Sequence, residues 1–160
     1  LPLWSSAEAC QETVREFLPD ADLVKLSDEE CFFVTGKHSI LDAADWLFEQ
    51  GCKMVLYSMG KEGAMILTPH FSSHVENPEV RVKDTTGAGD AIIGAYLYCL
   101  AKNHITVSQL AYCLPEQVQE WLTFAVYYAN YSITKSGAIA SYPDYTTFVK
   151  WMQEKRKKAH

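Results

Sequence analysis

The sequence predicts an α/β domain in which a partly parallel sheet is covered by helices. Segments with helical spacing alternate with short apolar runs in the first half of the chain, as they do where helices connect parallel strands. The chain has 160 residues, 48% of them hydrophobic, which is enough for one compact core. We therefore expect residues 1–160 to belong to a single domain, without repeats or a flexible linker.

Capping patterns delimit the helices of the first half. A serine followed three residues later by an acidic residue can satisfy the free amides at a helix start. Such pairs are Ser5 with Glu8, Ser27 with Glu30, and Ser39 with Asp42. Proline or glycine ends each segment. The helices predicted on this basis cover residues 5–18, 27–36 and 39–51.

Short apolar runs predict the strands, and the rest of the chain returns to helical spacing. The predicted strands are residues 22–26, 53–60, 64–69 after a turn at Gly63, and edge strands within 70–82. The predicted later helices are residues 87–102, one or two within 105–132 with Pro115 at a start, and a last helix from about residue 144.

Charge and cysteine usage limit the partners and the compartment. The net charge of −6 argues against nucleic acid or an anionic membrane as the main partner. Neither a signal peptide nor an apolar run of membrane-spanning length is visible. The five cysteines are odd in number and lack metal-ligand spacing, which favours the reducing cytoplasm.

The string DTTGAGD, residues 84–90, carries the most specific chemistry. Gly87, Ala88 and Gly89 allow a tight turn at a helix start, where free amides and the helix dipole favour an anion. Asp90 would repel that anion, but a phosphoryl-transfer enzyme needs a base beside the attacking hydroxyl. The alternative is an ordinary helix entry capped by Asp84 or Asp90.

DTTGAGDAIIGAYL resembles the C-terminal signature of the ribokinase-like (pfkB-type) carbohydrate kinases. Residues 1–36 resemble the middle of a fructokinase, and VLYSMGKEGAMI resembles the strand–turn–strand that contacts the nucleotide. FAVYYANYSITKSGAIASYP resembles the last helix of the family and its Lys-x-Gly-Ala turn. The order and spacing agree over nearly the whole chain. The resemblance implies the ribokinase-like three-layer α/β/α fold, here its C-terminal nucleotide-binding half without the N-terminal sheet and β-lid.

This resemblance implies phosphate transfer from ATP, with Mg²⁺, to a sugar hydroxyl, giving fructose 6-phosphate if the sugar is fructose. Asp90 matches the catalytic base, and Gly87, Ala88 and Gly89 match the anion hole. Further matches are Lys25 to a phosphate-contacting lysine, and Glu30 to the residue that organises Mg²⁺ through water. Ser27 stands where many members have Asn. Ser27 and Glu30 can serve as a helix cap and as part of the phosphate site at once.

The remaining matches concern the nucleotide and a monovalent cation. Ser58, Gly60 and Gly63 match the nucleotide-binding turn. Val126 stands where related kinases often have Asn or His beside the adenine, and valine cannot donate a hydrogen bond. The residues that resemble a potassium site are Asp84, Thr86 and the turn from Gly137 to Ser141.

Family members are about twice this length, and their N-terminal half grips the sugar. Because the chain starts at Leu1 without methionine, we expect a fragment of a longer kinase that is inactive alone. Relatives often form homodimers through the lid, which is absent here. Ribose, 2-keto-3-deoxygluconate or a nucleoside remain alternatives to fructose. A chain complete at this length would instead be a non-catalytic nucleotide-binding module.

Overall fold

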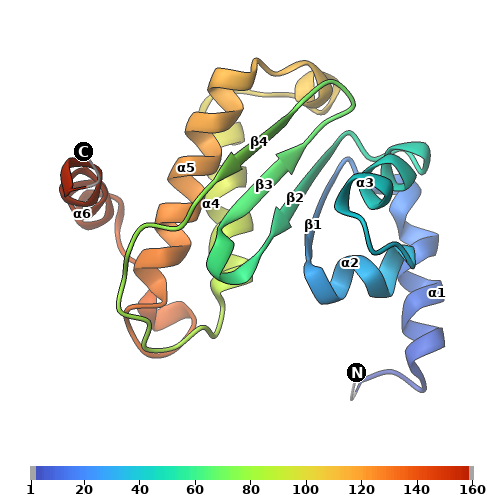
Figure 1. Ribbon diagram of the computed structural model, residues 1–160, viewed down its shortest axis with the longest axis horizontal. Helices are drawn as coiled ribbons and strands as arrows, with labels where there is room; N and C mark the ends of the chain where they lie inside the picture. The colour runs from blue at the N-terminus through green and yellow to red at the C-terminus, as the bar shows by residue number, and fades with distance from the viewer. Residues whose placement is uncertain (1–2, 159–160) are drawn as a thin grey trace.

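The computed structural model describes residues 3–158 and contains a four-stranded mixed sheet with helices on both faces (Figure 1). The strands are β1 Leu23–Ser27, β2 Met54–Ser58, β3 Ala64–Leu67 and β4 Ser72–Val75. They lie in this order across the sheet; β1 is parallel to β2, and the other pairs are antiparallel. The prediction of a partly parallel sheet is therefore confirmed. Of residues 70–82, only the four of β4 form a strand.

Six α-helices and four short 3-10 helices make up the rest of the regular structure in residues 3–158. The α-helices are α1 Ala7–Phe17, α2 Asp28–Thr35, α3 Ile40–Glu49, α4 Ala88–Lys102, α5 Pro115–Ser132 and α6 Tyr145–Lys158. The 3-10 helices are η1 Leu18–Asp20, η2 Gly60–Glu62, η3 Val107–Tyr112 and η4 Ile139–Ser141. Within this described part, no helix combines the length and hydropathy needed to cross a bilayer.

The capping patterns place two helix starts correctly and miss a third by one residue. The Ser27 hydroxyl and the Glu30 carboxylate form a complete capping box at the start of α2, and Ser39 caps α3. The cap of α1 is Ser6, not Ser5 as predicted. Ser6 has the extended backbone that a cap requires and accepts a hydrogen bond from the Ala9 amide at 3.0 Å. The third residue of α1 is therefore an alanine, and no capping box can form.

Alternation along β2 divides the interior into two cores on opposite faces of the sheet. Met54 and Leu56 face α4 and α5 and belong to the core that we call the α4–α5 core. Val55 and Tyr57 face the other way, into the α1–α3 core. A smaller aromatic cluster, centred on the fully buried Phe148, joins α6 to α5. The sheet is thus packed between two helical layers.

Both cores contain buried free cysteines. Cys31 and Cys52 belong to the α1–α3 core, and Cys99 and Cys113 belong to the α4–α5 core. Burial raises the pKa of all four thiols, and that of Cys99 reaches about 11. Each thiol is therefore protonated and behaves as a small hydrophobic group at neutral pH.

Candidate active site

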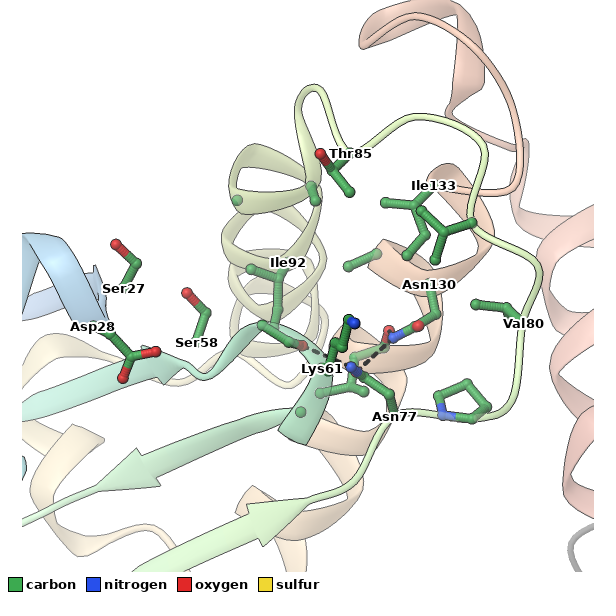
Figure 2. Close-up of a pocket in the computed structure, with 18 of the residues that line it drawn as sticks. Ser27, Asp28, Ser58, Lys61, Asn77, Val80, Thr85, Ile92, Asn130 and Ile133 are labelled. Carbon is green, nitrogen blue, oxygen red and sulfur yellow. Dashed lines mark hydrogen bonds between the residues drawn. The ribbon is translucent and has the colours of Figure 1, made fainter.

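A cavity of about 930 Å³ opens where the carboxyl ends of β1 and β2 meet the start of α4 (Figure 2). The η2 turn and residues 77–82, which follow β4, form two of its walls, and α5 forms a third. Ligands of α/β proteins commonly bind at the carboxyl ends of parallel strands. The cavity therefore lies where the fold itself favours a ligand site.

The start of α4 presents free backbone donors. The Ala88 amide donates to the Thr85 carbonyl at 3.1 Å, and the first intrahelical bond runs from the Ala91 amide to the Gly87 carbonyl at 2.8 Å. Within residues 3–158, no hydrogen bond occupies the amides of Gly87, Gly89 and Asp90. These three amides lie at the positive end of a 15-residue helix. The turn can thus hold an anion, with Ala88 contributing to its shape rather than a free donor.

Gly87 has to be glycine for two reasons. Its φ of 79° lies in the left-handed region, where a side chain causes strain. A β-carbon here would also stand 2.8 Å from both the Ala138 β-carbon and the Tyr142 hydroxyl oxygen. Tyr142 donates a hydrogen bond to the Gly87 carbonyl at 2.9 Å. Burial and the nearby Asp90 carboxylate raise the pKa of Tyr142, so its hydroxyl keeps its proton at neutral pH.

Lys25, from β1, reaches the same turn and is paired with Glu30 from the first turn of α2. The Lys25 Nζ lies 3.1 Å from Glu30 Oε2 and 3.0 Å from the place that a β-carbon on Gly89 would take. The lysine is thus directly beside the free amides. Its side chain is 19% exposed and that of Glu30 is 54% exposed. The end of β1, the start of α2 and the start of α4 therefore bring one ammonium group, free backbone amides and the Glu30 carboxylate together.

Glu30 fits the role of a ligand that holds Mg²⁺ through water. Partial burial would raise its pKa, but the Ser27 amide and Lys25 more than offset this and lower it. The carboxylate is therefore ionised at neutral pH. Oε2 accepts hydrogen bonds from Lys25 and Ser27, whereas Oε1 is free within the described residues. Hard oxygen donors suit Mg²⁺, which keeps several waters. The described residues contain no group of three or more His, Cys, Asp or Glu side chains suited to a metal.

Asp84 joins the segment before α4 to the turn after α5. Its Oδ1 accepts from the Thr86 amide at 3.0 Å, and its Oδ2 accepts from the Gly137 amide at 2.8 Å. The Gly137 and Thr86 amides lower the pKa of Asp84 to about 2. Ser141 is buried, and its hydroxyl donates to the Ala138 carbonyl at 2.6 Å. The structure thus brings Asp84, Thr86 and Gly137 together, while the Ser141 hydroxyl is engaged within its own turn.

The predicted nucleotide-binding turn lies on the cavity wall. Ser58, Gly60 and Gly63 all line the cavity. Gly63 has a φ of 102°, and a β-carbon there would stand 2.0 Å from the Val75 carbonyl oxygen. This glycine therefore permits the close approach of β3 to β4, whatever it also does for a ligand. Val126, 1% exposed, lines the cavity from α5.

Two asparagines on the cavity wall were not predicted from the sequence. Asn130 donates from Nδ2 to Asn77 Oδ1 at 2.8 Å and to the Val126 carbonyl at 2.9 Å. Asn77 in turn donates to the Gly60 carbonyl at 2.8 Å (Figure 2). The chain of amides links α5, residue 77 and the η2 turn. Asn130 follows Val126 by four residues and so shares its helix face, which is the one signal that could have revealed it.

Comparison with known proteins identifies the family of the chain. Residues 1–145 match the model of the pfkB family carbohydrate kinases. The chain belongs to the pfkB family. Fructokinase-2 of Solanum habrochaites is 33% identical to this pfkB chain over 144 residues, which cover 89% of the chain and 42% of that protein.

Two solved fructokinases share the fold of this pfkB chain. One, from Xylella fastidiosa with bound ATP, has a TM-score of 0.86 at 26% identity, covering 95% of the chain and 48% of that protein. Another, a double mutant from Vibrio cholerae O395 with fructose, ADP and a potassium ion, has a TM-score of 0.80 at 28% identity, covering 94% and 47%. The fold is thus ribokinase-like, and the pfkB chain spans about half the length of the relatives it matches.

Proposed function

We propose that this chain provides the ATP-binding and base-bearing part of a sugar kinase that converts fructose to fructose 6-phosphate. One observation carries the proposal: the Lys25 ammonium lies beside the free amides at the start of α4 and is paired there with the Glu30 carboxylate. Phosphoryl transfer needs positive charge and fixed donors around the transferred group, with a base beside the attacking hydroxyl. Asp90 is exposed in the first turn of the same helix.

In the proposed reaction, the Asp90 carboxylate accepts the proton of the sugar hydroxyl while the hydroxyl oxygen attacks the γ-phosphorus of ATP. The bond from the γ-phosphorus to the oxygen bridging the β-phosphate breaks, and ADP leaves. The amides of Gly89 and Asp90 and the Lys25 ammonium stabilise the negative charge on the phosphoryl oxygens. Glu30 would hold Mg²⁺ through water, and this ion supplies further charge neutralisation when bound. Asp84, Thr86 and the carbonyls of the Gly137–Ser141 turn would hold a potassium ion beside this corner.

The choice of fructose rests on relatives rather than on a sugar-contacting residue. The relatives named above are fructokinases, and the Vibrio cholerae structure contains fructose itself. Ribose, 2-keto-3-deoxygluconate and nucleosides are the competing acceptors. A panel of these compounds, assayed for ADP release with the protein as its source produces it, tests the choice. If another acceptor turned over fastest, the proposed substrate would change, but the assignment of the active site would stand.

The variant Asp90→Asn tests the base. Turnover should fall by about 10²–10⁴-fold, since the amide cannot accept the proton, while ATP binding measured by calorimetry should persist. Asp42→Asn is the matched control, because Asp42 holds the equivalent third position of α3 and is exposed outside the cavity. Near-normal turnover in Asp90→Asn would exclude Asp90 as the base. A wild-type protein that binds ATP but phosphorylates no acceptor would instead indicate a non-catalytic nucleotide-binding module.

A further inference from the structure

Val126 leaves one part of the cavity wall without a hydrogen-bonding side chain. Its side chain is almost completely buried, and its carbonyl already accepts from Asn130. One helical turn further along α5, Asn130 lines the same cavity and is 5% exposed (Figure 2). A polar side chain buried to this extent in a cavity wall requires partners for its atoms.

The orientation of the Asn130 amide is fixed by its neighbours. The Val126 carbonyl can only accept, so the atom that faces it has to be Nδ2. The same logic orients Asn77, since its Nδ2 faces the Gly60 carbonyl and its Oδ1 therefore faces Asn130. Both hydrogens of the Asn130 amide are thus occupied, one by Val126 and one by Asn77.

The remaining polar atom, Asn130 Oδ1, faces the cavity. No hydrogen bond within residues 3–158 occupies it. In that same part of the chain, no fully buried side-chain oxygen or nitrogen lacks a partner. Oδ1 therefore retains contact with the space of the cavity. The two hydrogen bonds made by Nδ2 prevent the amide from flipping. Oδ1 therefore stays toward the cavity, and this side chain can offer the cavity only an acceptor.

We propose that Asn130 determines base specificity: its Oδ1 accepts a hydrogen bond from the exocyclic amino group of the nucleotide base. This inference rests on the proposed function, since it assumes that the cavity holds a nucleotide. The amino group at position 6 of adenine satisfies the acceptor. A carbonyl at the same position, as in hypoxanthine, sets two acceptors against each other and leaves both without a donor.

The surroundings suit a flat ring beside this acceptor. Val126 of α5 gives the cavity apolar surface one helical turn from Asn130. Ile92 of α4 and Ile133, which follows α5, add to it (Figure 2). Such walls bind either purine face without distinguishing their edges. Discrimination between bases therefore falls to the polar atom, and Asn77 acts as a positioning residue that keeps the amide from turning.

The test compares the affinities of ATP and ITP, whose bases differ at position 6, for the protein as its source produces it. Calorimetry should show ATP binding about tenfold or more tightly than ITP, in keeping with one hydrogen bond gained and one acceptor left unpaired. In Asn130→Leu, which preserves size and removes both polar atoms, the ratio should fall to about one. Gln117→Leu, which also replaces a carboxamide by leucine but at an exposed position of α5 outside the cavity, should keep the wild-type ratio.

The outcomes separate this inference from the proposed function. Equal wild-type affinities for ATP and ITP overturn the role of Asn130 while the cavity remains a nucleotide site, and no folding question arises because no variant is involved. An ATP preference that survives in Asn130→Leu overturns it as well. Binding of neither nucleotide overturns the proposed function, and the inference falls with it.

Discussion

The Tyr142 hydroxyl donates a hydrogen bond to the Gly87 carbonyl oxygen at 2.9 Å, although 55 residues separate the two. The same carbonyl accepts the first intrahelical bond of α4, from Ala91. The hydroxyl of Tyr142, which lies between η4 and α6, therefore holds Gly87 in its left-handed conformation. Gly87 begins the turn that carries the free amides of the candidate site. The position of Asp90, three residues further on, depends on the same turn.

Tyr142→Phe should weaken this turn without removing the ring that packs near Tyr128. We expect a loss of about 1 kcal/mol in the free energy of unfolding, measured in urea, from one hydrogen bond. Turnover should also fall, by up to about tenfold, because the amides and Asp90 lose their fixed direction. Tyr128→Phe is the control, since it removes a hydroxyl whose one hydrogen bond within residues 3–158 goes to the Pro143 carbonyl. Equal loss of turnover in both variants would refute a positioning role for Tyr142.

Gly63→Ala should destabilise the fold by about 3 kcal/mol or more in urea unfolding. The added β-carbon would lie 2.0 Å from the Val75 carbonyl oxygen, and the backbone has a φ of 102°. Gly94→Ala provides the contrast, because Gly94 lies in α4 with nothing within 4 Å of an added β-carbon. This second variant should be neutral or more stable by up to about 1 kcal/mol. A mild effect of Gly63→Ala would show that β3 and β4 can separate at little cost.

Asp84 should make stability depend on pH in the acid range. Its folded-state pKa of about 2 lies below the ordinary value of 3.8, so its ionised form stabilises the native state above the unfolded pKa. That stabilisation disappears as the pH falls from about 4 to about 2. Asp84→Asn should therefore lower the melting temperature at pH 6, and the difference from wild type should shrink by pH 2.5. A pH-independent difference would assign the effect to packing instead of charge.

Local chemistry accounts for what could be predicted from the sequence. The start of α2 depends on Ser27 and Glu30, which lie three residues apart, and its end depends on the left-handed Gly36. The start of α4 follows from its glycines, and that of α5 from Pro115 at the first helical position. The first helix shows the limit of such patterns, because two adjacent serines are equivalent as caps until the backbone of one becomes extended.

Contacts between distant segments account for what could not be predicted. Asn77 and Asn130 are 53 residues apart, and no periodicity encodes their meeting across the cavity. Their partnership depends on how β4 is placed against α5, which only the packed structure determines. The proximity of Lys25 to Gly89 is of the same kind, since it requires the ends of β1 and α4 to converge. Both residues were predicted from the sequence as site residues, but their closeness in space could not be predicted from it.

Each of the two cores contains two buried thiols, so the thiols of one core can report when its helical layer opens. Cys31 and Cys52 are covered by one helical layer, and Cys99 and Cys113 by the other. Because each thiol is buried and protonated, an alkylating reagent can reach it only after its own layer lifts from the sheet. The order in which these thiols are modified under native conditions would thus reveal which layer opens first. The order of modification would show whether the layer packed against β1, which carries Lys25, opens before the layer that contains α4 and Asp90.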